Sequence, residues 1–104
     1  MEKIEKDGNV AVLVSPGFGA GWSTWADDDK KEAMCMDARI VGAFLSGGSA
    51  AAVQVAVDMF PDIYTGGGHK LRVEWVPKGK AFEVEEYDGN ESLHMLGDRT
   101  YLVA

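Results

Sequence analysis

Residues 15–25 combine glycines at alternate positions with aromatic side chains, a pattern that can bind a ligand. The glycines are Gly17, Gly19 and Gly21, and the aromatic residues are Phe18, Trp22 and Trp25. Backbone N–H groups of a glycine-rich turn can bind an anion, and aromatic rings can stack on a base. The segment completes neither the P-loop nor the dinucleotide fingerprint. It predicts either a ligand site or a tight bend in which Phe18 and one tryptophan pack the core.

A second group of candidates lies in residues 85–91, Glu-Glu-Tyr-Asp-Gly-Asn-Glu, where carboxylates crowd a turn beside a tyrosine hydroxyl. Two carboxylates in different environments can divide acid and base roles in a hydrolase. The spacing does not require this chemistry, because a strand end with solvated acids around an Asp-Gly turn has the same pattern. We therefore predict no catalytic residue in this segment.

Cys35, His69 and His94 are the remaining candidates for nucleophilic or metal chemistry. Cys35 lies between two methionines, which favours an inert buried thiol. The sequence does not pair either histidine with a nucleophile, and these residues lack a recognised zinc-ligand spacing. We predict no metal site and no cofactor.

Arg39 and Lys70 are candidate cations for a phosphate. Arg39 falls in the first turn of an expected helix, where the helix N-terminus already favours an anion. An exposed arginine on a helix is the alternative interpretation.

These candidates need elements to position them, and the first half of the chain predicts one strand and two short helices. The β-branched run of residues 10–14 predicts a buried strand in the centre of a sheet. Asp37 offers an N-cap to a helix over residues 38–45, which Gly47 and Gly48 would end. Ser49 offers a cap to a second helix over residues 50–60.

The last forty residues predict antiparallel β structure. Residues 71–75 alternate in polarity, and the Pro-Lys-Gly-Lys sequence of residues 77–80 predicts a hairpin turn into a strand over residues 81–87. Asp88-Gly89-Asn90 predicts the next turn, and residues 92–95 and 100–103 predict two more strands around a Gly97-Asp98 turn. The expected fold is a single small α+β domain over residues 1–104, mainly an antiparallel sheet with a C-terminal hairpin or meander and about two short helices.

The composition limits the classes of molecule that the protein can bind and the cellular compartment in which we expect it. The chain has 104 residues and a formal net charge of −7, which argues against direct binding to a nucleic acid backbone. One cysteine permits no internal disulfide, the charged N-terminus lacks a signal-peptide core, and we expect no membrane span. These features predict a protein of the cytoplasm.

Three segments together resemble a family of small proteins encoded by phages and prophages. They are residues 15–25, residues 73–79 (Val-Glu-Trp-Val-Pro-Lys-Gly) and residues 86–91 (Glu-Tyr-Asp-Gly-Asn-Glu). The resemblance covers most of the chain but brings no catalytic residue with it. It implies a protein of the host bacterial cytoplasm that inhibits antiviral defence.

Two modes of inhibition compete. In the first, a symmetric homo-oligomer sequesters a nucleotide-derived signal, with Phe18, Trp22 or Trp25 stacking on the base and loop amides with Arg39 holding phosphate. In the second, the acidic chain blocks a host defence effector or nuclease by direct binding, as an anti-CRISPR or DNA mimic would. The concentrated loop favours sequestration, the net charge favours blocking, and a small nucleotide hydrolase is the third alternative.

Overall fold

The computed structural model describes residues 1–95 and 102–104. Its first sheet has a buried strand in the centre. The sheet has the antiparallel order β1 (Glu5–Lys6), β2 (Asn9–Val14), β3 (Arg72–Pro77). Residues 10–14 are fully buried, which confirms the expected central strand.

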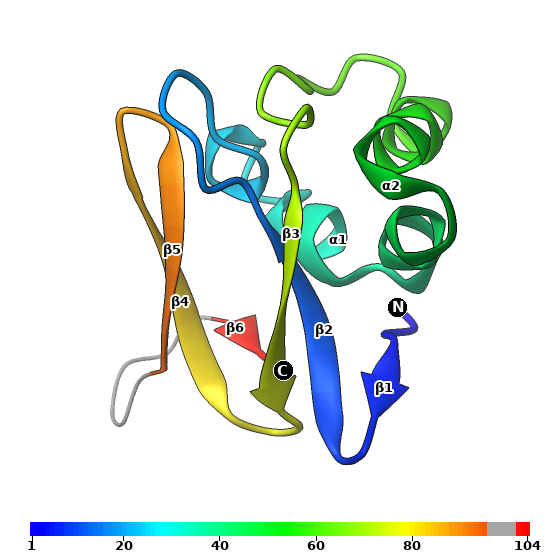
Figure 1. Cartoon of the computed structure of the whole chain (residues 1–104), viewed down its shortest axis with the longest axis vertical. Coiled ribbons are helices and arrows are strands. Elements are labelled where there is room, and N and C mark those ends of the chain that lie inside the picture. The colour runs from blue at the N-terminus through cyan, green and yellow to red at the C-terminus, as the bar shows by residue number, and fades with distance from the viewer. Residues whose placement is uncertain (96–101) are drawn as a thin grey trace.

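The two faces of β2 belong to two different cores, because successive side chains of a strand point to opposite sides. Ala11 and Leu13 pack with the helices, whereas Val10 and Val12 pack with the second sheet and with Cys35 and Met36. β2 therefore lies between the helices on one side and the second sheet on the other (Figure 1).

The second sheet has the order β5 (Asn90–Met95), β4 (Ala81–Tyr87), β6 (Leu102–Val103), again antiparallel. Asp88 and Gly89 both have positive φ, 49° and 85°, as a tight two-residue hairpin turn requires. The turn at residues 88–90 and the strand over residues 92–95 are confirmed. The Gly97-Asp98 turn lies outside the described residues.

The expected hairpin between residues 71–75 and 81–87 is wrong. β3 pairs with β2 from Asn9↔Pro77 to Val14↔Arg72, and β4 pairs with β5 and β6 instead. The turn at residues 77–80 carries the chain from one sheet into the other: the amide of Lys78 donates to Gly8 and that of Gly79 to Ala104. The apolar β2 takes β3 as its partner because Val73 and Val76 can then join the two cores.

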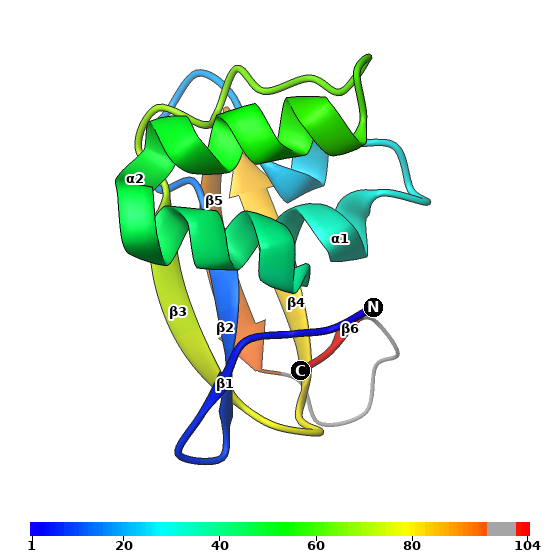
Figure 2. The same cartoon turned by 90° about the vertical axis from the view of Figure 1, so that its right-hand side faces the viewer.

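Two helices cover the first sheet, α1 (Lys31–Met36) and α2 (Ala38–Met59), preceded by a short 3₁₀ turn, η1 (Ser23–Trp25). Asp37 caps α2, since its carboxylate accepts the amide hydrogen of Arg39 at 2.9 Å. Gly48 has φ 83° and interrupts α2. Figure 2 shows the chain reversing there, so that the two halves lie side by side. This agrees with two short helices separated at Gly47-Gly48.

By length and composition alone, α2 is apolar enough to cross a membrane. The break at Gly48, however, divides its 22 residues into two halves. Each half is well below the ~20 residues that a span needs. The antiparallel strands and short helices confirm the expected small α+β fold.

Candidate functional site

The glycine-aromatic segment, residues 15–25, contacts two other segments at one end of the molecule. The amide of Gly19 donates to the carbonyl of Asp88 at 2.6 Å, and the amide of Glu91 donates to that of Ser15 at 2.8 Å. On the other side, a Cβ added at Gly67 would lie 2.5 Å from the carbonyl oxygen of Gly21. The loop therefore lies between the β4–β5 turn and residues 64–68 (Figure 1).

The carboxylate of Glu91 holds this loop from inside. Its Oε1 accepts the Ser15 amide hydrogen at 2.9 Å, and its Oε2 accepts those of Trp22 at 2.7 Å and Thr24 at 3.0 Å. The Thr24 hydroxyl donates to the same oxygen at 2.6 Å. Glu91 is only 1% exposed, so these donors replace the water that it would otherwise bind.

This arrangement changes the interpretation of the loop as an anion site. Its amides do converge on an anion, as glycine-rich turns allow, but that anion is the protein's own Glu91. The interpretation of residues 85–91 as solvated acids is therefore wrong for Glu91. A phosphate would need other donors, because the amides of Ser15, Trp22 and Thr24 are already bonded.

The aromatic residues of the loop separate into one buried ring and two exposed rings. Trp22 is fully buried, and its indole N–H donates to the carbonyl of Met34 at 2.6 Å. Phe18 is 66% exposed and Trp25 is 42% exposed, so Phe18 does not pack the core. The core thus receives one tryptophan, and the other two rings remain available at the surface.

Two of the three glycines serve the bend. Gly19 has φ 113°, a conformation that favours glycine. A Cβ at Gly21 would lie 2.6 Å from the Trp25 ring, whereas one at Gly17 would meet open space.

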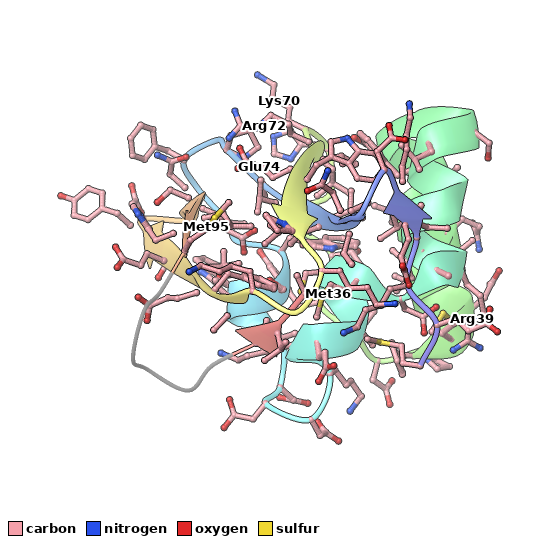
Figure 3. The ribbon with its side chains drawn as sticks, turned by 90° about the horizontal axis from the view of Figure 1, so that it is seen from below. Met36, Arg39, Lys70, Arg72, Glu74 and Met95 are labelled. Carbon is pink, nitrogen blue, oxygen red and sulfur yellow. The ribbon has the colours of Figure 1, made fainter. Side chains whose placement is uncertain are left out.

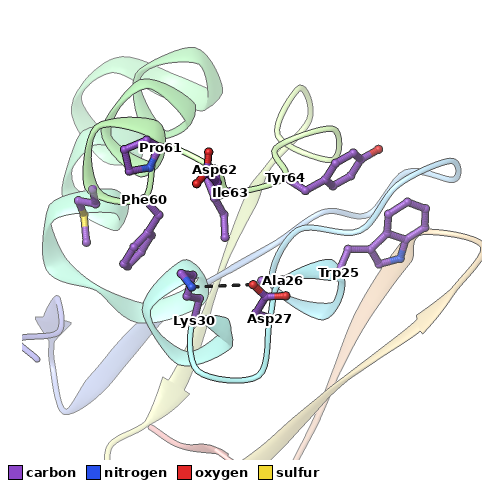
Figure 4. Close-up of a pocket in the computed structure, with 10 residues that line it drawn as sticks. Trp25, Ala26, Asp27, Lys30, Phe60, Pro61, Asp62, Ile63 and Tyr64 are labelled. Atoms are coloured by element: carbon purple, nitrogen blue, oxygen red, sulfur yellow. Dashed lines mark ion pairs between the residues drawn. The ribbon is translucent and has the colours of Figure 1, made fainter.

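Trp25 lies on the rim of a pocket with a volume of about 330 Å³, between η1 and the segment that follows α2. Its ring stacks on that of Tyr64 with centroids 5.6 Å apart and an interplanar angle of 27°. Figure 4 shows this pair at one end of the pocket and Phe60 at the other. The volume falls at the lower end of the range for small-molecule sites.

Lys30 supplies the positive charge of this pocket. Its ammonium lies 5.9 Å from the centre of the Phe60 ring. It pairs with carboxylate oxygens of Asp29 at 3.5 Å and Asp27 at 3.8 Å. Asp62 adds a second carboxylate to the lining. The pocket thus offers aromatic surface and one cation beside two acids.

Arg39 lies apart from this pocket. Its guanidinium pairs with Asp37 at 2.9 Å, and this hydrogen-bonded pair lowers the pKa of the Asp37 carboxyl. It lines a different surface pocket beside Met1 and Glu2. Figure 3 shows it far from Lys70 and Arg72, so these cations do not converge on one site.

The remaining nucleophile candidates do not form a reactive group. Cys35 is fully buried, and burial raises the pKa of its thiol to about 12, in agreement with an inert cysteine. Ser92 Oγ lies 3.2 Å from Nε2 of His94, and a Glu85 oxygen lies 3.6 Å from that same nitrogen. In a catalytic triad the hydroxyl and the carboxylate occupy opposite nitrogens of the imidazole, so this geometry does not match one.

His69 faces the carbonyl of Gly66 at 3.3 Å. Within residues 1–95 and 102–104, no group of three or more His, Cys, Asp or Glu side chains is arranged to hold a metal ion.

Sequence reasoning missed Glu91 as the anchor and Lys30, Phe60 and Tyr64 as pocket residues. One signal for Glu91 was available: it shares the inward face of its strand with Leu93, as period-two alternation indicates. The pocket residues come from segments whose approach depends on the tertiary fold.

The scan against protein-family models and the searches of curated proteins and solved structures each found no match to this chain.

Proposed function

We propose that this protein is a phage-encoded inhibitor of host antiviral defence that binds and sequesters a nucleotide-derived signalling molecule without cleaving it. The phage context rests on the sequence resemblance alone. The binding mode is supported by one observation, the stacked Trp25–Tyr64 pair on the rim of a pocket that also contains Lys30.

The pocket chemistry suits a flat ring with a small anionic group. A base can stack on the rim pair, because every base has an aromatic face, and such stacking contributes ~1–3 kcal/mol. Lys30 can then face a phosphate. Asp27 and Asp62 oppose further negative charge, so we expect a monophosphate or a cyclic phosphate to bind better than a triphosphate.

The proposal is tested by native mass spectrometry of the protein purified from cells with active nucleotide-signalling defences. We expect an intact nucleotide bound to the protein, and its release on denaturation would identify it. A protein that carries no nucleotide from such cells would overturn the proposal, and recovery of a cleaved nucleotide would indicate a hydrolase.

A matched pair of variants tests the location of the site. Trp25→Ala should abolish the bound nucleotide, whereas Trp75→Ala should retain it, because Trp75 is similarly exposed, at 39%, but lies on β3. Lys30→Met should weaken binding of the monophosphate more than binding of the free nucleoside. Equal losses in Trp25→Ala and Trp75→Ala would place the ligand elsewhere.

A further inference from the structure

The most exposed aromatic pair of the described chain lies outside the Trp25–Tyr64 pocket. Phe18 and Tyr87 are 66% and 78% exposed and meet edge to face, with ring centroids 6.4 Å apart. Phe18 comes from the glycine loop and Tyr87 from the end of β4. With Glu85, Glu86 and Asp88, these two residues form a surface that we call the hairpin tip.

The backbone beneath the hairpin tip is held in place. The Gly19 amide bonds to the Asp88 carbonyl, and the Gly89 amide donates to the Glu86 carboxylate at 2.6 Å. Gly89 also packs so closely on Ala20 that it leaves no room for a Cβ. Since this backbone is already ordered, a partner that contacts Phe18 and Tyr87 does not also have to order the loop and the turn that carry them.

The charge around this pair is negative. Residues 81–95 contain five acidic residues and no lysine or arginine. Glu85, Glu86 and Asp88 are all exposed. Arg72, at the start of β3 in the other sheet, is paired with Glu74 at 3.1 Å.

We propose that the hairpin tip is a docking site for a basic protein surface, with an arginine of that protein stacked on Tyr87 and paired with the adjacent carboxylates. Tyrosine rings attract cations over their faces, and the planar guanidinium both stacks on a ring and matches a carboxylate. Aromatic residues and arginine also dominate the energetics of protein interfaces. This function is separate from ligand sequestration, because no hairpin-tip residue lines the Trp25–Tyr64 pocket.

The same charges disfavour other occupants. A nucleic acid or an anionic lipid surface would be repelled by Glu85, Glu86 and Asp88. A lysine-bearing surface would gain the charge attraction but less of the stacking, so arginine should be preferred to lysine.

The test uses three short synthetic peptides in which glycine alternates with arginine, lysine or glutamate. Each is titrated into the full chain at low salt, and the amide NMR shifts are followed. We expect the arginine peptide to bind most tightly, with shifts concentrated at residues 18–19 and 85–90. Tyr87→Ala should weaken it about threefold to fivefold. Glu85→Lys should also weaken it, and more strongly at low salt than at high salt.

Glu5→Lys is the matched control, because it makes the same charge change at an exposed residue of β1. It should leave the affinity for the arginine peptide within a factor of about two. Equal weakening by Glu5→Lys and Glu85→Lys would overturn the proposal, since diffuse charge would then explain binding. Shifts elsewhere, no binding of the arginine peptide, or Tyr87-dependent self-association in ultracentrifugation would also overturn it.

Discussion

Trp22 and Trp25 lie three residues apart in the same glycine-rich segment and belong to different parts of the molecule. Trp22 is fully buried and bonded to the Met34 carbonyl, whereas Trp25 is 42% exposed and stacked on Tyr64. The carboxylate of Glu91 accepts the amide hydrogens of Trp22 and of Thr24, the residue before Trp25.

The difference separates a framework from a rim. The framework consists of Trp22, Glu91 and the close-packed Gly21, which fix the backbone of the loop. The rim of the loop, as distinct from the pocket rim, consists of the exposed rings of Phe18 and Trp25. Recognition groups on a rigid support keep their geometry at low entropic cost, as in binding sites whose loops are ordered before the ligand arrives. Framework substitutions should therefore reduce stability, and rim substitutions should reduce binding.

The largest expected effect is at Glu91. Glu91→Ala leaves the buried amides of Ser15 and Trp22 and the half-buried donors of Thr24 without their partner. Each orphaned buried donor costs roughly 1–3 kcal/mol. We expect the free energy of unfolding to fall by at least about 3 kcal/mol in urea titrations. Glu86→Ala removes the carboxylate directly across the β4–β5 pair and should cost far less, because Glu86 is exposed and accepts one backbone amide, that of Gly89. Similar losses in both variants would refute the anchoring role.

The two tryptophans provide the next test. Trp22→Ala should lower the free energy of unfolding by about 3–5 kcal/mol, as large-to-small changes in a core do. Trp25→Ala should cost about 1 kcal/mol, the scale of one aromatic pair. Urea unfolding of both variants measures the contrast. If Trp25→Ala were the more destabilising variant, the division into framework and rim would be wrong.

The sequence predicted those parts of the fold that depend on local signals. The β-branched run of β2, the Asp37 cap, the break at Gly48 and the turn at Asp88-Gly89 all lie where neighbouring residues determine the backbone. The partner of β3 was mispredicted, because a hairpin turn and a crossover between sheets have similar local sequences. Only the packing of Val73 and Val76 into two cores distinguishes them.

Local signals also explain why the sequence predicted only part of the candidate site. Residues 15–25 were singled out by composition, yet composition does not tell Trp22 from Trp25. The role of Glu91 depends on its contact with Thr24, which is 67 residues away in the sequence. The role of Tyr64 depends on its contact with Trp25, which is 39 residues away. Such long-range contacts leave little trace in one sequence.

A smaller effect concerns Cys35, which belongs to the framework side. Burial raises its pKa from 9.0 to about 12, so above pH 9 the unfolded chain loses the thiol proton and the folded chain keeps it. Between pH 9 and about 12 the unfolded state then binds fewer protons, and stability falls as pH rises, by up to about 1.4 kcal/mol for each pH unit. Cys35→Ala should lack this component in urea unfolding at alkaline pH. A parallel pH dependence in both proteins would contradict it.

The smallest loss of stability is expected at Asp37. Like Glu91, its carboxylate accepts a backbone amide hydrogen, but its side-chain partner is the exposed Arg39. Asp37→Ala should cost about 1 kcal/mol, the usual contribution of a helix N-cap. The Arg39 pair lowers the pKa of Asp37, so this stability is present above the ordinary aspartate value and is lost as pH falls through the folded-state pKa. Acid titration of unfolding in wild type and Asp37→Asn measures the pair, because asparagine keeps a cap but not the charge. We expect Asp37→Ala to cost less than Glu91→Ala because the partner of Asp37, Arg39, is exposed. Equal losses of unfolding free energy in the two variants would contradict this explanation.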